Sequence, residues 1–304
     1  MVRVRRFRWS DLDGVLAVRN ACVTAGAGQG PATREGLAAY WSQGGVRAER
    51  DVWVVQGQDD LLAYGGLRPW HSPGWLQVEV AVLPAWRGQG LGGALLRRLS
   101  DDARQRRTAY LCAVAADEPA VAGRFLARNG FQPFVARQHM RLRPIVGPEA
   151  GTVPGFALRL AQPDDCAALA EVNNAAYPTG ERTGRANGAG YRRFIEASGA
   201  QVWVAVDVDA GGIAGLCEVR ETEAILDGTA VKTGHIGSLA VLPSYRRRGL
   251  GRWLLARGIA FCQELGRPSV ELNVDRDNTA ALQLYEHTGF QTTYAFTVYR
   301  RALL

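Results

Sequence analysis

The sequence lacks any apolar run that approaches the roughly 20 residues of a membrane span. Its basic start, MVRVRRFRWS, continues into DLDG rather than into an apolar stretch, so no secretion signal is expected. The five cysteines are odd in number and form no Cys-x-x-Cys pair, which is typical of reduced thiols. These features predict a cytoplasmic protein with neither a disulfide framework nor a bound metal.

The charge balance is basic but contains no concentrated basic segment. Net charge is +7, from 36 Lys and Arg against 29 Asp and Glu, and much of the excess is arginine. No arginine run is long enough, or interleaved enough with aromatic residues, to predict nucleic-acid binding. The excess is either a solvated basic surface or an attraction toward polyanionic ligands such as nucleotides.

One loop sequence occurs twice in the chain, with a constant spacing between matching residues. The first copy is VEVAVLPAWRGQGLGGALLRRL, and the second is HIGSLAVLPSYRRRGLGRWLLARGI. Both contain Arg-x-x-Gly-x-Gly, and the two arginines are 159 residues apart (246 − 87). The same offset relates these pairs: Arg87 and Arg246, Gly90 and Gly249, Gly92 and Gly251, Pro84 and Pro243, Phe131 and Phe290. Because 304 residues is a two-domain length at roughly 150 per domain, the fold unit is about half the chain.

The repeated turn has the features of an anion site. Short apolar runs end at Pro84 and Pro243, as strands do, and amphipathic helices begin at about Leu91 and Leu250. Between strand and helix the glycines remove Cβ atoms, so backbone N–H groups can converge on one concavity. The positive end of the helix dipole and the arginines favour a pyrophosphate there. An ordinary tight turn explains one copy, but two copies in register favour phosphate binding.

A competing interpretation is a dinucleotide-binding fingerprint. Gly88, Gly90 and Gly93 spell Gly-x-Gly-x-x-Gly, but the second copy has Arg247 in place of Gly88. The fingerprint also expects an acidic residue after a following strand, about 20 residues on, whereas Asp101-Asp102 falls within the helical stretch. The match is therefore interpreted as accidental.

The segment from Pro144 to Gly155 contains three prolines and three glycines and is interpreted as a linker. The predicted domains are residues 1–143, a linker at 144–155, and residues 156–304. In each half we expect strand, helix, glycine-rich loop, strands, repeated turn, helix, strand, helix and final strand. ETEAILDGTAVKTG adds a longer hairpin to the second half.

The order of elements, with the repeated turn followed by Asn278, Tyr285 and Gly289-Phe290, resembles the GCN5-related N-acetyltransferases (GNAT) over nearly the whole chain. The layout is similar to the tandem, mycothiol synthase-like members, but departs from them where GLCEVRET replaces an expected Trp-Thr-Lys stretch. The resemblance implies an α/β fold in two tandem copies, each a mixed sheet splayed between its fourth and fifth strands.

The resemblance also implies a site for acetyl-coenzyme A in the splay. The pantetheine arm would pair with the strand backbone at Leu239, Ala240 and Val241. The pyrophosphate would lie on the amides of Arg246, Arg247, Arg248, Gly249, Leu250 and Gly251, and Asn278 would reach the cofactor from the next helix. In the first half the corresponding cofactor residues would be Val82, Arg87, Gly88, Gly90 and Gly92.

Tyr285 lies where the family keeps its general acid, and a phenol of pKa about 10 can protonate a departing thiolate. The amide of Val241 could bond the thioester oxygen. Two bases are candidates: His235, whose unperturbed pKa near 6.5 needs no tuning, and Glu218, acting through water. We expect His235 to be the stronger candidate. The alternative for Tyr285 is a packed aromatic residue without a catalytic role, and the alternative for His235 is a structural histidine.

The first half departs at each catalytic position, with Leu126, Leu76 and Pro119 opposite Tyr285, His235 and Asn278. We therefore expect it to be catalytically silent. The predicted function is acetyl transfer from acetyl-coenzyme A to a primary amine of a small molecule, in a monomer or homodimer. The alternatives are an acyl-coenzyme A sensor, acetylation of a protein N-terminus or lysine, and an aminoacyl-tRNA-dependent transferase. Loop residues expected to face the acceptor are Glu181, Arg182 and Arg185.

Overall fold

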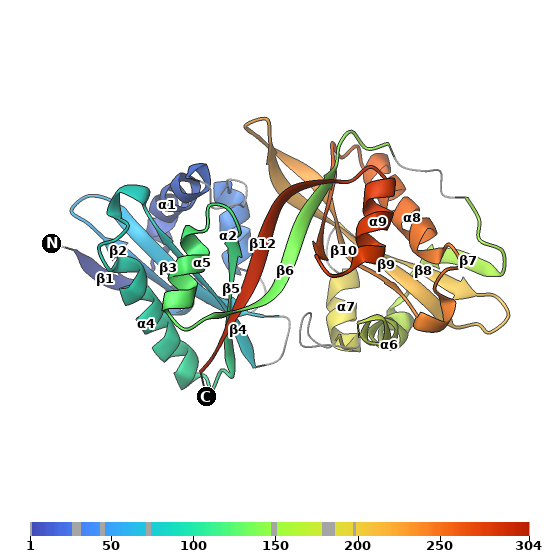
Figure 1. The fold of residues 1–304 in the computed structure, drawn as a ribbon, viewed down its shortest axis with the longest axis horizontal. Helices are drawn as coiled ribbons and strands as arrows, with labels where there is room; N and C mark the ends of the chain where they lie inside the picture. Colours follow the sequence, from blue (N-terminus) through green and yellow to red (C-terminus); the bar gives the residue numbers. More distant parts are fainter. Residues whose placement is uncertain are drawn as a thin grey trace. The chain divides into compact units, whose positions relative to one another are not determined.

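The computed structural model describes residues 2–25, 32–42, 46–70, 74–146, 151–177, 186–196 and 199–303. Glu181, Arg182 and Arg185 lie outside these ranges. The chain forms two compact units (Figure 1). Unit 1 comprises Met1–Arg137, Ala224–Ala230 and Tyr294–Leu304, and unit 2 comprises Gln138–Glu223 and Val231–Thr293. The units thus differ from a division at residues 144–155, because both draw residues from each half of the sequence.

Unit 1 begins with the first half of the chain. Its strands are β1 (Arg3–Arg6), β2 (Val52–Gln56), β3 (Leu61–Pro69), β4 (Trp75–Val82) and β5 (Tyr110–Ala116). Its helices are α1 (Leu12–Thr24), α2 (Arg34–Ser42), the short α3 (Ala48–Asp51), α4 (Leu91–Gln105) and α5 (Val121–Arg128). The first four strands pair antiparallel in chain order, and β4 pairs parallel with β5.

Unit 2 repeats this order. Its strands are β7 (Phe156–Leu160), β8 (Ala200–Asp207), β9 (Ile213–Leu226), β10 (Thr229–Val241) and β11 (Val270–Asp275). Its helices are α6 (Cys166–Ala176), α7 (Gly188–Glu196), α8 (Leu250–Glu264) and α9 (Thr279–His287). The strand order is β7-β8-β9-β10-β11, and β10 pairs parallel with β11. The predicted mixed α/β architecture in two copies is confirmed.

The final strand of each half contributes to the other unit. β12 (Gln291–Ala302) lies beside β5 in unit 1, with Phe296 opposite Ala116 and Ala302 opposite Tyr110. β6 (Gln132–Leu142) lies beside β11, and its Met140 and Leu142 are buried in the core of unit 2. Each sheet is therefore completed by a strand segment from the other half of the sequence, which the repeat did not predict.

Helices cover both faces of each sheet because strand residues alternate between two apolar cores. In unit 2, Val202, Val204 and Leu216 pack against α6 and α7. Cys217 and Val219, on the opposite face, pack against α8. Unit 1 has the same three layers, with α1 and α2 on one face and α4 and α5 on the other.

Both units begin with the same polar anchor. Arg5 makes two hydrogen bonds to the Asp11 carboxylate, of 2.6 and 2.8 Å, and Arg159 makes two to Asp165, of 2.6 and 2.9 Å. These hydrogen bonds lower the pKa of both carboxyls. Each carboxylate also accepts a backbone N–H three residues upstream, which fixes the turn before α1 or α6.

Candidate active site at the opening between β10 and β11

The parallel strand pair in each unit is short. In unit 2 the pairing runs only from Gly234 opposite Val270 to Ile236 opposite Leu272, although β10 continues to Val241. In unit 1 it runs from Trp75 opposite Tyr110 to Gln77 opposite Cys112, although β4 continues to Val82. Residues 237–241 and 78–82 thus lie beyond the registered pairs. The sheet opens between its fourth and fifth strands in both units.

The backbone of β10 beyond the pairing faces the opening at alternate residues. The Leu242 N–H donates to the Ala214 carbonyl of β9, 2.9 Å away, so residues 240 and 242 face β9 and residues 239 and 241 face away from it. The Val241 carbonyl accepts from Arg246 Nε at 3.3 Å, and the Leu239 carbonyl accepts from the Tyr177 hydroxyl at 2.9 Å. The amides of Leu239 and Val241 therefore face the opening. The Ala240 backbone faces β9.

The turn after β10 presents backbone amides and positive charge. A single 3-10 turn (Pro243–Tyr245) leads to Arg246, Arg247, Arg248 and Gly249, all exposed, before α8 begins at Leu250. The first amides of α8 have no intrahelical acceptor, as at the start of any helix. The N-cap residue Gly249, with a φ of 85°, has no side chain that could accept from them. Together with the helix dipole, these groups suit an anion.

The two copies of this turn share their backbone conformation. Gly88 and Gly90 have φ values of 79° and 81°, and Arg247 and Gly249 have 62° and 85°. Arg247 therefore holds a left-handed conformation that costs a non-glycine residue about 1–2 kcal/mol. Arg87 Nε donates to the Val82 carbonyl at 3.2 Å, as Arg246 does to Val241. The predicted equivalence of the two turns is confirmed in backbone conformation.

Gly92 and Gly251 each lie one residue into the helix after the turn. An ideal Cβ at Gly92 would lie 3.4 Å from the ring of Phe125 in α5, and one at Gly251 would lie 3.7 Å from Leu284 in α9. These glycines lie where the following helix approaches closely. Unlike Gly90 and Gly249, they have helical backbone.

Tyr285 lies in α9 with 7% of its surface exposed, and its ring centroid is 5.8 Å from that of Phe290. Burial raises the pKa of Tyr285, and the nearby Tyr177 and Cys217 add to the shift. A phenol of raised pKa stays protonated at neutral pH, which suits a proton donor rather than a base.

The surroundings of His235 shift its pKa away from the unperturbed value near 6.5 that favoured it as the base. His235 pairs in register with Glu271, and its Nδ1 has no hydrogen-bond partner among the described residues. Burial lowers the pKa of His235 to about 3, with the charges of Arg220 and His139 adding to the shift and Glu271 opposing it. The imidazole, on a residue that is half-buried, is therefore neutral at pH 7 and a weak base. The sequence alone could not reveal these surroundings.

Glu218 has the opposite property. Its Oε1 accepts a hydrogen bond of 2.6 Å from the hydroxyl of Tyr191 in α7. Burial raises the pKa of the Glu218 carboxyl, and the hydrogen bond from Tyr191 partly opposes that shift. A carboxylate of raised pKa accepts a proton more readily than an ordinary one. These directions favour Glu218 over His235 as the candidate base, and the assignment stays a prediction.

Asn278 is exposed and is the N-cap of α9, where its side-chain oxygen accepts the Ala281 N–H at 3.2 Å. This cap uses the amide oxygen. The predicted reach of Asn278 toward a cofactor would have to use its side-chain NH₂ group.

Unit 1 differs at the corresponding positions. Leu126 is 6% exposed in the apolar core beside α4, and Leu76 packs against the same core. On the α1 side of β4, Arg19 forms an ion pair of 2.6 Å with Glu79, which also accepts from Tyr64 at 2.5 Å. Unit 1 therefore has an internal ion pair on the strand whose unit 2 equivalent carries Ser238.

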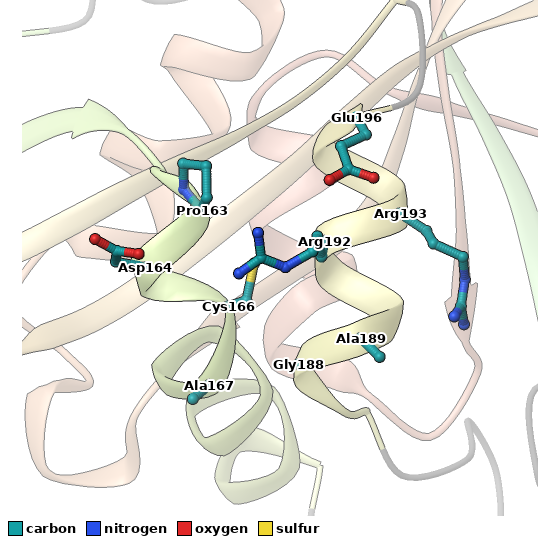
Figure 2. A pocket seen from close by; sticks show the side chains of 9 residues that line it. All are labelled: Pro163, Asp164, Cys166, Ala167, Gly188, Ala189, Arg192, Arg193 and Glu196. Carbon is teal, nitrogen blue, oxygen red and sulfur yellow. The ribbon is translucent and has the colours of Figure 1, made fainter.

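A pocket of about 610 Å³ lies elsewhere in unit 2, between the start of α6 and α7. Figure 2 shows Arg192 reaching across it toward Asp164 and Cys166, with Arg193 pointing away. None of the predicted site residues lines this pocket. The predicted site residues of unit 2 lie instead on β9, β10, the turn before α8, and α9.

Two family models match the chain: "Acetyltransferase (GNAT) family" over residues 167–290, and "Acetyltransferase (GNAT) domain" over residues 48–133. A mycothiol acetyltransferase of Thermobispora bispora is 31% identical, with 96% of each chain covered. One of Rhodococcus opacus is 27% identical and covers 97% of this chain and 98% of its own. The chain belongs to the GNAT acetyltransferase family.

Solved structures support the same fold for this GNAT acetyltransferase. A GCN5-related N-acetyltransferase from Sphaerobacter thermophilus aligns with a TM-score of 0.81 at 22% identity, covering 99% of this chain and 96% of its own. A tandem GNAT protein of the clavulanic acid biosynthesis pathway aligns with a TM-score of 0.75 at 17% identity, covering 100% and 99%. The resemblance drawn from the repeated turn is confirmed, as is the assignment to the acyltransferases.

Sequence analysis missed two tyrosines of this GNAT acetyltransferase, Tyr177 and Tyr191. Tyr177 bonds the Leu239 carbonyl, and Tyr191 bonds Glu218. Both lie beside a glycine-rich loop, at the end of α6 and within α7, where no local pattern marks a polar partner. The repeat has a second spacing, of 154 residues, that relates Asn20 and Ala32 to Asn174 and Ala186. In the structure Asn20 bonds both backbone groups of Ala32, and Asn174 does so with Ala186. That second offset aligns α6 and α7 with α1 and α2.

Within the described residues, no helix is long and apolar enough to cross a membrane. The same part of the chain contains no group of three or more His, Cys, Asp and Glu side chains arranged to hold a metal ion. The five cysteines are free and buried.

Proposed function

We propose that unit 2 transfers the acetyl group of acetyl-coenzyme A directly to a primary amine of a small molecule bound beside it. The observation that carries the proposal is that one unit combines the open edge of β10, the amide-rich turn before α8, Tyr285 and Glu218. Unit 1 has the open edge and the turn but has leucine at the position of the phenol.

The cofactor fits the groups that the opening presents. The amides at the start of α8 and the charges of Arg246 to Arg248 would hold the pyrophosphate. The amides of Leu239 and Val241 face the opening and would pair with the pantetheine arm as an added strand does. The N–H of Val241 would then bond the thioester oxygen as negative charge develops on it.

Proton transfer falls to the half-buried Glu218 and the buried Tyr285. Glu218 would take a proton from the acceptor's ammonium or amine, directly or through water, as nitrogen attacks the thioester carbonyl. Tyr285 would give its proton to sulfur as the C–S bond breaks, so the products are an N-acetyl amine and the free thiol of coenzyme A. Burial favours both roles, because it keeps the phenol protonated and makes the carboxylate more basic.

The name shared by the relatives supports a choice of first acceptor. Since they are called mycothiol acetyltransferases, mycothiol without its acetyl group is the first amine to test. Replacement of the expected Trp-Thr-Lys stretch by GLCEVRET is a reason to test other amines in parallel.

The test measures acetyl-coenzyme A binding by calorimetry and thiol release with desacetyl-mycothiol and a panel of primary amines, for the full chain and for Tyr285→Phe. Thiol release is followed as coenzyme A separated by chromatography, because the first acceptor carries a thiol of its own. We expect binding in both proteins and thiol release at least tenfold slower in the variant. Binding without thiol release from any amine would contradict the proposal and favour an acyl-coenzyme A sensor. Release only with peptide amines would favour a protein acceptor.

A further inference from the structure

The Glu218 carboxylate lies between a buried donor and the opening of the sheet. Its Oε1 accepts from Tyr191, whose side chain is 5% exposed. Its Oε2 lies on the side of Gly237, where an ideal Cβ would be 3.1 Å from it. Gly237 is exposed and directly follows Ile236, the last paired residue of β10. One oxygen is therefore held inside the unit while the other borders the opening.

Glycine at position 237 leaves room for this arrangement. A side chain there would meet Oε2 at a distance tighter than ordinary van der Waals contact, so either the strand or the carboxylate would shift. Without a Cβ at that residue, Oε2 can be approached across the exposed backbone of β10. The space beside Oε2 is therefore open to a ligand that enters the opening.

Unit 1 has none of these three residues. Strand register places Gly66 at the position of Glu218, since Val52 pairs with Gly66 and Val202 with Glu218. The 159-residue offset places Val78 at the position of Gly237. Thr33 and Asn187 cap the equivalent turns before α2 and α7, which places Leu37 at the position of Tyr191. Donor, carboxylate and glycine are present together in one unit and absent together from the other.

We propose that Tyr191 is a positioning residue for acetyl transfer: its hydroxyl holds Oε1 of Glu218 so that Oε2 faces the acceptor amine across Gly237. This inference rests on the proposed function, since it takes Glu218 as the base. It adds to it the group that orients the base and the oxygen that takes the proton.

The hydrogen bond stabilises the charged carboxylate, so its loss should make Glu218 easier to protonate. In Tyr191→Phe we expect the acid limb of the kcat/KM profile for desacetyl-mycothiol to move up by about one pH unit, since a hydrogen bond to a charged group is typically worth that much. Acetyl-coenzyme A affinity should be unchanged. If that amine is not turned over, the fastest amine of the panel replaces it.

A second measurement needs no acceptor. With glutamate labelled by ¹³C at the side-chain carboxyl, the resonance missing from Glu218→Gln identifies Glu218, and its titration should shift upward in Tyr191→Phe. The matched control is Tyr64→Phe in unit 1, which also removes a hydrogen bond from a phenol to a carboxylate, that of Glu79. We expect the control to leave both the limb and the Glu218 titration unchanged.

The outcomes separate the two proposals. If Glu218→Gln abolishes the limb but Tyr191→Phe moves neither the limb nor the resonance, Tyr191 does not position the base, and the proposed function stands. If Glu218→Gln keeps the limb and the rate, Glu218 is not the base, and both the assignment of the base and this inference are wrong. A shift of equal size in Tyr64→Phe would also overturn the role of Tyr191.

Discussion

The two units share a backbone plan but differ in what their openings contain. Both have a parallel strand pair of three residue pairs, a left-handed glycine before the following helix, and an arginine bonded to the end of the strand. In unit 2 Tyr191 bonds Glu218, whereas in unit 1 Arg19, Tyr64 and Glu79 bond one another. The backbone features of the opening are therefore common to both units, and the polar side chains near it differ.

The largest effect should come from removing the base in unit 2. Glu218→Gln keeps the shape and can still accept from Tyr191 but cannot take a proton, so we expect kcat to fall about 10³-fold. Steady-state thiol release measures this. Glu79→Gln is the counterpart in unit 1, and its kcat should stay within about twofold of the wild-type value. Equal losses in both variants would show that the units do not differ in catalysis.

Removing the candidate acid should have the next largest effect. Tyr285→Phe retains the packing against Phe290 but loses the proton donor, so kcat should fall about 10²-fold with acetyl-coenzyme A affinity retained. Leu126→Ala, at the same place in unit 1, leaves a cavity and should lower the free energy of unfolding by about 2–5 kcal/mol. The melting temperature should fall accordingly. Its kcat at a temperature where it remains folded should match the wild type.

The turns themselves provide a third test. Valine at Gly249, where φ is 85°, would be strained and would crowd the amides of the turn, so acetyl-coenzyme A should bind at least about tenfold more weakly, or 1.4 kcal/mol. Calorimetry of Gly90→Val then shows whether unit 1 also binds. A stoichiometry that falls from two to one would mean that both turns hold the cofactor. Unchanged affinity in Gly249→Val would refute the pyrophosphate site of unit 2.

The smallest catalytic effect is expected for His235. Because burial keeps its imidazole neutral, His235→Ala should leave the acid limb of kcat/KM in place. Its effect should appear in stability instead. A histidine whose folded pKa is lowered from 6.5 to about 3 is neutral in both the folded and the unfolded state above pH 6.5, so the shift costs no stability there. As pH falls toward 3, the unfolded state gains the proton first and the fold loses stability. The wild-type melting temperature should therefore fall more steeply across that window than that of His235→Ala. Loss of the limb in the variant would restore His235 as the base.

Local sequence was sufficient for the elements and for the turn. Apolar runs ending at Pro84 and Pro243, and glycines before an amphipathic helix, specify a strand, a left-handed turn and a helix wherever they occur. The Asp101-Asp102 pair falls within α4, as predicted, and Asp102 there bonds Arg6 and Trp53 rather than a ribose. The elements and the turn depend on residues close together in the chain, whereas the partners of Asp102 do not.

The features that sequence did not reveal depend on contacts between distant residues. Alternation in β6 and β12 buries Met140 or Val298 on one face, but the strand that pairs with each is set by long-range packing. The burial of His235 and the donor to Glu218 likewise come from other elements. The sequence does not show which residues surround a histidine or a tyrosine, so the preference for Glu218 over His235 draws on the structure and stays a prediction.

The exchanged strands also bear on how the chain is made. β5 ends at Ala116, and the strand that pairs with it, β12, ends at Ala302, 186 residues later. At roughly 5–20 residues per second, a ribosome needs about 10–40 s to synthesise that interval. Throughout it, the edge of β5 that β12 will cover lacks its final partner, and unpaired edges invite association with other chains. The tandem repeat therefore does not give two independently maturing halves, because the first unit is completed only after residues 291–302 have been synthesised.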